Sequence, residues 1–324
     1  MKPVYSLVLP IFNEEAVIPL LLRRLDDLMT RLDAPVEVIF VDDGSRDTGP
    51  IVLEAKARAD SRYRFVKLSR NFGHQIAITT GMERATGEAV IVMDADLQDP
   101  PEVVLEMIAK WKEGFEIVYA QRLSREGETS FKRLTANVFY RLLARLSEVE
   151  IPRDVGDFRL VDRKALDAFL AMPERERFVR GMFAWIGFRQ AVVSFHRPAR
   201  VAGETKYSLA KMLRLAANGV ISFSDAPLRL ALWAGLGVSG LAMIYGAFVI
   251  AMWLVGAHLE RGWSSTIVLI AFLGGANMLM TGILGVYVGR IYSEVKRRPL
   301  YLVDRAIGFE SGEASAAEPL RRRA

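Results

Sequence analysis

The chain has 324 residues, of which 51% are hydrophobic, so it is longer than one average domain and more apolar than most soluble proteins. It contains no cysteine, which excludes disulfides and thiolate metal sites, and its three histidines are far apart, which argues against zinc. Any metal is therefore expected to have oxygen ligands. The net charge of +5 could indicate nucleic acid, but the basic residues concentrate beside apolar segments, which favours anionic lipid and no nucleic acid.

The first two-thirds of the chain alternates apolar runs with segments of helical periodicity. Strands are expected at Tyr5–Ile11, Val36–Val41, Arg64–Leu68, Ala89–Met93 and Glu116–Ala120. Helices are expected near 14–32, 48–59, 75–85, 101–112 and 130–146. This alternation predicts βαβ units and an α/β fold with a mostly parallel, Rossmann-like sheet.

Polar clusters follow three of the expected strands. They are PIFNEE at 10–15, VDDGS at 41–45 and DADLQD at 94–99. Ligands of such sheets bind at the carboxyl ends of the strands, so we expect these clusters to form one site.

The third cluster carries two carboxylates, Asp94 and Asp96, one residue apart. Side chains alternate along a strand, so this spacing can place both on one side of a strand end, where they can share Mg²⁺ or Mn²⁺. Such a cation would neutralise charge on a departing diphosphate. The alternative is that these residues only form a turn or cap a helix.

Two long apolar segments follow. The 28 residues between Arg229 and His258 carry no charge, and neither do the 28 between Arg261 and Arg290. At a rise of about 1.5 Å per residue, each can cross a hydrocarbon core of about 30 Å, so we predict two transmembrane helices rather than buried core helices. Basic residues concentrate outside this pair, which predicts both termini in the cytoplasm.

The flanks and glycines of these segments suggest further features. Leu209, Met212, Leu213, Ala216 and Val220 recur at helical spacing, which predicts an amphipathic interfacial helix; an ordinary surface helix is the alternative. Gly235, Gly237 and Gly240 spell GxGxxG inside an apolar run. Together with Gly285 and Gly289 they indicate close helix packing, and possible homo-oligomers, rather than dinucleotide binding.

The motifs LPIFNEE, VDDGSRDTG, DADLQDPPE, GDFRL and GETKYS, followed by two spans, resemble the polyprenyl-phosphate glycosyltransferases of inverting glycosyltransferase family 2. The chain is most similar to the bactoprenol glucosyltransferases and the dolichyl-phosphate mannose synthases. The resemblance implies a glycosyltransferase-A catalytic domain at 1–206, an interfacial helix region at 207–227, a transmembrane domain at 228–292 and a cytoplasmic basic tail at 293–324 with a disordered end. It also implies the bacterial inner membrane, with the catalytic domain in the cytoplasm.

The same resemblance assigns roles to residues that bind the donor. Asp94 and Asp96 match its metal and diphosphate motif. The other matched donor-binding residues are Pro10, Asn13, Glu14, Asp42, Asp43 and Gln98. The alternatives are that the Asn-Glu pair caps the following helix and that the DDGS sequence is an ordinary turn.

The implied acceptor is a lipid monophosphate, which is largely dianionic at neutral pH and can attack the anomeric carbon without losing a proton. A general base is therefore optional, whereas cations are needed to gather two anionic substrates. The candidate phosphate-binding residues are Arg122, Arg133, Arg200 and Lys206. Asp157 matches a third catalytic carboxylate, whose role as sugar contact, acceptor orienter or base stays open.

The resulting expectation is transfer of one hexose, glucose, from a UDP-sugar to undecaprenyl phosphate with inversion, for modification of cell-envelope glycans. One alternative is a processive polysaccharide synthase, but those enzymes carry a QxxRW motif and more spans, and neither occurs here. The other is a catalytically silent membrane adaptor that binds a nucleotide sugar, against which the intact carboxylates argue.

Overall fold

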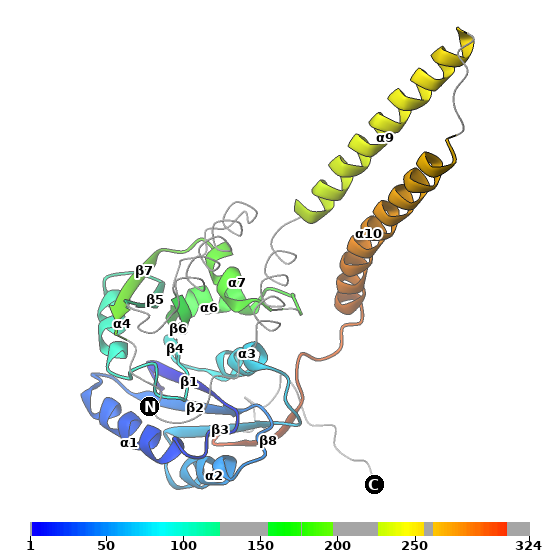
Figure 1. Cartoon of the computed structure of the whole chain (residues 1–324). Coiled ribbons are helices and arrows are strands. Elements are labelled where there is room, and N and C mark those ends of the chain that lie inside the picture. The colour runs from blue at the N-terminus through cyan, green and yellow to red at the C-terminus, as the bar shows by residue number, and fades with distance from the viewer. Residues whose placement is uncertain (1, 124–154, 176, 197–225, 256–261, 310–324) are drawn as a thin grey trace. The chain divides into compact units, whose positions relative to one another are not determined.

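The computed structural model describes residues 2–123, 155–175, 177–196, 226–255 and 262–309. They fall into two compact units (Figure 1). The first unit, called the catalytic unit after the domain that the resemblance implies at 1–206, consists of the described residues up to His196 together with Arg298–Phe309. The helical unit spans the described residues from Ala226 to Arg297.

The catalytic unit contains an eight-stranded sheet in the order β7-β5-β6-β4-β1-β2-β3-β8. Its strands are β1 (Tyr5–Ile11), β2 (Val36–Asp42), β3 (Tyr63–Leu68), β4 (Ala89–Val92), β5 (Ile117–Arg122), β6 (Val155–Asp162), β7 (Gln190–Phe195) and β8 (Val303–Ile307). Its helices are α1 (Ile18–Arg31), α2 (Gly49–Ala59), α3 (His74–Arg84), α4 (Val103–Lys112), α6 (Arg163–Leu170) and α7 (Val179–Trp185).

The sheet is mostly parallel, as predicted. Strands β1 to β4 run parallel to one another, and β5 runs parallel to β7. The exceptions are β6, antiparallel to both β4 and β5, and β8, antiparallel to β3. The five predicted strands are confirmed with ends that differ by one or two residues, while β6, β7 and β8 were not predicted. The helix predicted at 130–146 lies outside the described residues.

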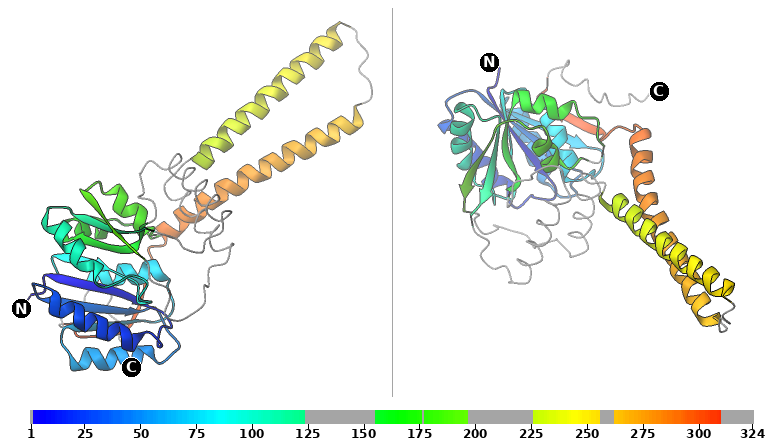
Figure 2. Two further views of the ribbon diagram at one scale, coloured as in Figure 1. Left: turned by 60° about the vertical axis from the view of Figure 1, so that its left-hand side comes forward. Right: turned by 90° about the horizontal axis from the view of Figure 1, so that it is seen from above.

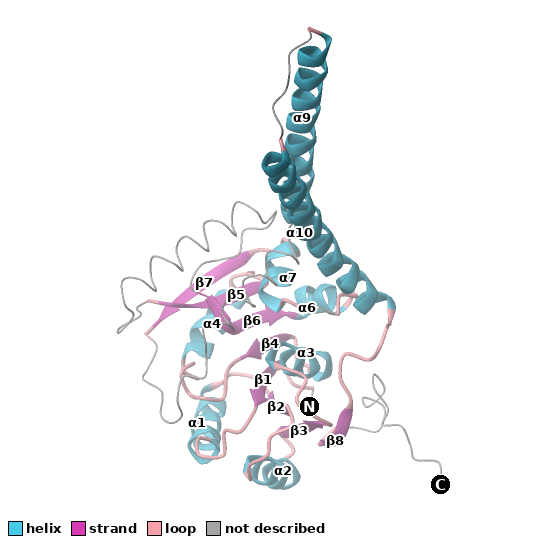
Figure 3. Cartoon of the chain, turned by 45° about the vertical axis from the view of Figure 1, so that its right-hand side comes forward, coloured by secondary structure: helices cyan, strands magenta, loops and turns pink. Residues whose placement is uncertain are grey.

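Central strands have apolar runs because both faces of the sheet are covered. All seven residues of β1 are buried. Helices α1, α2 and α4 contribute to the core cluster on one face, while α3, α6 and α7 lie on the other (Figure 3). Helix α3 packs so closely that a Cβ on Gly81 would lie 2.3 Å from Cγ1 of Val8 and 3.1 Å from Cγ2 of Val41.

The antiparallel direction of β6 decides where its first residues lie. Val155 pairs with Gln121 near the end of β5, and Arg159 pairs with Val92 at the end of β4. Because β6 begins where its neighbours end, Asp157 lies at the same edge of the sheet as the carboxyl ends of the parallel strands.

The helical unit consists of α9 (Ala226–Leu254) and α10 (Trp263–Val295), which lie side by side (Figure 2). Both are candidate membrane spans, with mean hydropathy 1.5 over Ala231–Phe248 and 1.8 over Val268–Val295. None of the side chains described in these two stretches is buried in the structure, which is unlike the core helix of a soluble protein.

The predicted glycine packing is found at one position. A Cβ on Gly235 would lie 3.4 Å from Cε of Met280 on the neighbouring helix. The space around Gly237, Gly240 and Gly285 is open within 4 Å in the described part of the chain, as it is around Gly289. Association of chains through these glycines stays a prediction.

The C-terminal boundary differs from the one expected. The basic tail was placed at 293–324, but the described residues from Arg298 belong to the catalytic unit, and Val303–Ile307 form its edge strand β8. Ser69 donates its N–H to the carbonyl of Leu302, and Tyr301 bonds to Glu83. Most of the interfacial region at 207–227 lies outside the described residues.

Candidate active site

The two carboxylates of the central motif lie in a turn rather than on a strand. Strand β4 ends at Val92, so the strand alternation invoked for Asp94 and Asp96 does not apply. Asp96 Oδ1 accepts the N–H of Gln98 at 3.1 Å, and Leu97 has a φ of 59°, a left-handed conformation that costs energy for a branched residue. The turn itself therefore sets the direction of both carboxylates.

A third carboxylate supports this turn. The side chain of Asp99 is buried, and its Oδ2 accepts the N–H of Asp94 at 3.1 Å. Burial and the charge of Asp94 raise the pKa of Asp99 to about 7. Burial also raises the pKa of Asp94, and the charges of Asp157 and Asp96 add to that effect while His74 opposes it.

This excess of negative charge bears on metal binding. Mg²⁺ usually takes one or two protein carboxylates and keeps the rest of its shell for water and substrate phosphates. In the described parts of the chain, no group of three or more His, Asp or Glu side chains could hold a metal ion by itself. The oxygens of Asp94 and Asp96 fit a metal that is shared with a diphosphate, because a cation would offset the repulsion described above.

Asp157 is the centre of a hydrogen-bond network at the same edge. Its Oδ1 accepts from Arg180 Nε at 3.0 Å and Arg159 Nη2 at 3.1 Å, and its Oδ2 accepts from Arg180 Nη2 and Gln75 Nε2, both at 3.2 Å. Burial alone would raise the pKa of Asp157, but the charge of Arg180 and the bonds from His74 and Arg180 hold that pKa well below its usual range. The carboxylate is therefore ionised at neutral pH.

His74 lies between the two groups of carboxylates. Its Nε2 is 3.3 Å from Oδ2 of Asp157 and 3.5 Å from Oδ1 of Asp94. Desolvation lowers the pKa of His74, but the bond to Asp157 and the charge of Asp94 outweigh it and raise the pKa to about 9. The imidazole is thus a cation that connects the predicted metal carboxylate to Asp157.

Arg122, at the end of β5, is near the same carboxylates. Its charge lowers the pKa of both Asp94 and Asp99. A Cβ on Gly156 would lie 2.9 Å from Nη2 of Arg122, so the guanidinium lies close to the backbone of this glycine. Of the predicted phosphate-binding residues, Arg122 is placed at the site, whereas Arg133, Arg200 and Lys206 lie outside the described residues.

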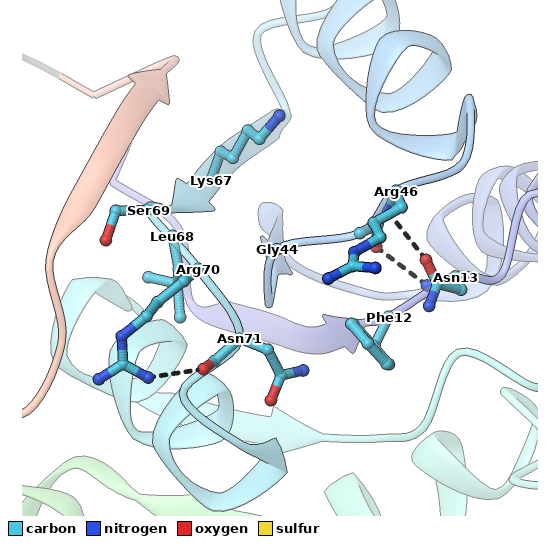
Figure 4. A pocket seen from close by; sticks show the side chains of 10 residues that line it. Phe12, Asn13, Gly44, Arg46, Lys67, Leu68, Ser69, Arg70 and Asn71 are labelled. Carbon is cyan, nitrogen blue, oxygen red and sulfur yellow. Dashed lines mark hydrogen bonds between the residues drawn. The ribbon is translucent and has the colours of Figure 1, made fainter.

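A pocket of about 490 Å³ opens at the carboxyl ends of β1, β2 and β3 (Figure 4). More of its wall is apolar than polar, and three basic residues, Arg46, Lys67 and Arg70, belong to the lining. The lining residues are Phe12, Asn13, Gly44, Ser45, Arg46, Lys67, Leu68, Ser69, Arg70 and Asn71.

Asn13 joins the first two loops of this pocket. It has a φ of 55°, its N–H donates to Oγ of Ser45 at 2.9 Å, and its Oδ1 accepts the N–H of Arg46 at 2.9 Å. The N-cap of α1 is Val17, without a side-chain cap, so Asn13 and Glu14 do not cap that helix. Pro10 is buried inside β1, beyond the last pair between β1 and β4.

Asp42 and Asp43 are buried and do not line the pocket. Asp42 Oδ1 accepts the N–H of Ser45, and Asp43 accepts the N–H groups of Phe72 at 2.6 Å and Gly73 at 2.9 Å. Burial raises the pKa of both carboxyl groups. Their contact with a base or ribose stays a prediction, since the contacts within the chain show them shaping the surrounding loops.

Sequence reasoning missed several residues of this site, including His74, Gln75, Asp99 and Arg180. A signal existed for the first two, because NFGHQ follows the end of β3 and therefore reaches the carboxyl edge of the sheet. Arg180 had no such signal, since it comes from α7, a short helix that was not predicted.

Comparison with known proteins places this site in a family. Residues 6–170, just over half of the chain, match the family described as Glycosyl transferase family 2. The chain belongs to that family. It is a glycosyltransferase similar to the bactoprenol glucosyl transferases.

The similarity to curated relatives extends over nearly the whole chain. It is 48% identical over 307 residues to an uncharacterized glycosyltransferase, YkcC, of Bacillus subtilis, covering 95% of each chain. It is 40% identical over 300 residues to a prophage bactoprenol glucosyl transferase homolog of Escherichia coli, covering 93% of this chain and 98% of the relative. A prophage-derived bactoprenol glucosyl transferase of Shigella flexneri is also 40% identical, over 301 residues, with coverage of 93% and 97%.

Solved structures show more distant similarity. Glucosyl-3-phosphoglycerate synthase of Mycobacterium tuberculosis, in complex with Mn²⁺, UDP-glucose and phosphoglyceric acid, matches with a TM-score of 0.45 and 23% identity, covering 68% of this chain and 79% of its own. A mannosyltransferase of Pyrobaculum calidifontis, in complex with GDP-Man and Mn²⁺, matches with a TM-score of 0.42 and 18% identity, covering 87% and 88%.

Proposed function

We propose that this glycosyltransferase transfers one glucose from UDP-glucose to undecaprenyl phosphate, with inversion, at the cytoplasmic face of the bacterial inner membrane. Relatives that carry the name bactoprenol glucosyl transferase support this acceptor, because they are similar over more than nine-tenths of the chain. Two exposed apolar helices support an acceptor that resides in a bilayer.

Two neighbouring features of the sheet edge support a binding position for the donor. The pocket beside β1, β2 and β3 has a volume suited to a nucleoside, and Asn13 and Ser45 offer it polar groups. The diphosphate would then lie towards Asp94 and Asp96, with Gln98 as a further polar contact. A bound Mg²⁺ or Mn²⁺ on these two carboxylates would supply positive charge for the departing diphosphate.

The acceptor phosphate needs cations rather than a base. Its dianionic oxygen attacks the anomeric carbon, the bond from that carbon to UDP breaks, and UDP leaves with the bonding electrons, so no proton has to move. Arg122 is positioned to attract the phosphate, and the predicted Arg133, Arg200 and Lys206 would complete the set. Asp157 is a poor base because its pKa is so low, which favours an orienting role.

One observation carries this proposal: the two carboxylates of the central motif, Arg122 and the ionised Asp157 all lie at one edge of the sheet, in a chain with two exposed apolar helices. The test uses purified full-length protein in detergent with undecaprenyl phosphate, Mg²⁺ or Mn²⁺, and a panel of radiolabelled nucleotide sugars. We expect labelled lipid from UDP-glucose, with inverted anomeric configuration. Labelled lipid from another donor alone would contradict the choice of sugar, and no labelled lipid from any donor would refute the proposal.

A further inference from the structure

We propose that Gln75 is a positioning residue for this reaction: it holds the carboxylate of Asp157, and through it Arg180, in the orientation that transfer requires. This inference rests on the proposed function, since it assigns Asp157 and Arg180 to the transfer site. Gln75 is the second residue of α3.

The side-chain amide of Gln75 makes two hydrogen bonds that fix its orientation. Its Nε2 donates to Oδ2 of Asp157 at 3.2 Å, and its Oε1 accepts the N–H of Val179 at 3.2 Å. An ionised carboxylate only accepts and a backbone N–H only donates, so the amide cannot be turned around without losing both bonds. Gln75 therefore connects three elements: α3, β6 and the start of α7.

Asp157 needs such a support because its other partners come from different directions. Arg159 lies two residues further along the same strand, and His74 begins α3, whereas Arg180 belongs to α7. The two bonds from Arg180 can fix the carboxylate only if α7 is itself fixed relative to β6. Gln75 connects α7 to β6, because the same amide that donates to Asp157 also accepts the N–H of Val179, the residue before Arg180.

The position of Gln75 is in turn fixed from the donor side. The N–H groups of Phe72 and Gly73, which precede α3, donate to the buried carboxylate of Asp43. The same segment includes Arg70 and Asn71, which line the pocket. The segment before α3 is therefore held by Asp43 and also lines the pocket, and Gln75, two residues after Gly73, bonds to Asp157.

A matched pair of variants separates the two bonds of Gln75. In Gln75→Glu the carboxylate can still accept from Val179, but the donor to Asp157 is replaced by a repelling oxygen. In Gln75→Leu both bonds are lost. Gln190→Glu is the control for added charge, because Gln190 pairs with Ile117 at the start of β5, at the opposite edge of the sheet.

The experiment measures kcat, the KM for UDP-glucose and the thermal midpoint of the full-length protein. Each Gln75 variant is studied alone and in combination with Asp157→Asn. We expect Gln75→Glu to lower kcat at least tenfold, with the donor KM within error of wild type and of Gln190→Glu. In the Asp157→Asn background the same change should lower kcat less than threefold, because its effect passes through that carboxylate. A wild-type kcat in Gln75→Glu would overturn the proposal. So would a fall in kcat that is as large in the Asp157→Asn background as in the wild type.

Failure of the proposed function would be recognised separately. If wild-type protein transfers no hexose, the proposed function falls, and the thermal midpoints then decide the inference. Gln75→Leu and Asp157→Asn should lower the midpoint by less in combination than the sum of their separate effects, as coupled residues do. Additive shifts would show that Gln75 does not hold Asp157, and the positioning role would be rejected.

Discussion

Asp157 and Arg180 are joined by two hydrogen bonds, from Nε to Oδ1 at 3.0 Å and from Nη2 to Oδ2 at 3.2 Å. The guanidinium matches the carboxylate with both ends of its planar fork, a geometry that fixes direction as well as distance. Because Arg180 helps to hold the pKa of Asp157 well below its usual range, the carboxylate is a weak base, which supports the proposed orienting role.

The first prediction concerns this pair. Arg180→Lys keeps the charge but cannot form both bonds, because an ammonium group has no planar fork. We expect kcat to fall about tenfold or more and the free energy of unfolding to fall by roughly 1–2 kcal/mol. Kinetic assays and thermal unfolding would measure both. Arg23→Lys, on the exposed side of α1, should change neither, and unaltered turnover in Arg180→Lys would argue against the orienting role.

The second prediction concerns the central motif. Asp96→Ala removes one of the two carboxylates that would share a metal with the diphosphate. We expect transfer to drop by about a hundredfold or more, that is by at least about 2.7 kcal/mol in activation free energy, while the protein still inserts and folds. Asp27→Ala, at an exposed position of α1, is the matched control. Full activity of Asp96→Ala at low Mg²⁺ would remove the metal argument.

The third prediction is a pH dependence of stability. The hydrogen bonds from Arg62 lower the pKa of Asp60 to about 2 from an ordinary value of 3.8. Because the folded-state pKa is depressed, this contribution to stability is complete above about pH 4 and is lost as the pH falls towards 2.

Thermal unfolding at pH 5 and pH 2.5, with wild type and Asp60→Asn, would test this prediction. The wild type should lose more stability than the variant over this interval. The difference should be modest, about 1 kcal/mol or less, since Arg62 is half exposed. Parallel losses in the two proteins would show that the ion pair contributes nothing.

The fourth prediction concerns the packing of α3 against the sheet. A methyl group at Gly81 would meet Val8 at 2.3 Å, so Gly81→Ala must push α3 away from β1. We expect a loss of about 1–3 kcal/mol in the free energy of unfolding. Transfer should fall as well, because α3 carries His74 and Gln75.

Gly237→Ala provides the comparison, because no atom lies within 4 Å of a Cβ at that position in the described residues. It should leave both the unfolding temperature and the transfer rate unchanged. Equal stability of the two alanine variants would contradict the close packing of α3 on the sheet.

The fifth prediction is the membrane topology. The absence of cysteine makes single-cysteine variants of the whole protein easy to interpret. We expect a membrane-impermeant maleimide added to intact cells to label Glu260→Cys, between the two spans. Glu113→Cys and Lys296→Cys should be labelled only after lysis, because basic residues flank the pair of spans and favour the cytoplasm. The reverse pattern would place the catalytic unit outside.

The parts of the fold that were predictable are those with a local pattern. Strands β1, β2 and β4 are buried on both faces and therefore appear as continuous apolar runs. Strand β8 carries charges in its sequence VDRAI, since it lies at an exposed edge, and this pattern alone does not indicate a strand.

The site was predictable to a similar extent. Asp94 and Asp96 were found from their residue type, although a turn rather than strand alternation sets their directions. Asp157 was found by resemblance, because its place at the edge depends on the antiparallel direction of β6, which no local pattern reveals. The partners of Asp157 come from α3 and α7, and such a distant pairing is visible only in three dimensions.

Strand β8 is the last strand of the sheet to be synthesised, because it follows α9 and α10 in the chain. A ribosome makes both apolar helices before it makes Val303–Ile307, so the strand that pairs with the outer edge of β3 is synthesised only after both helices. Uncovered strands of this kind invite aggregation. A version that stops at residue 206 lacks β8 and should consequently aggregate.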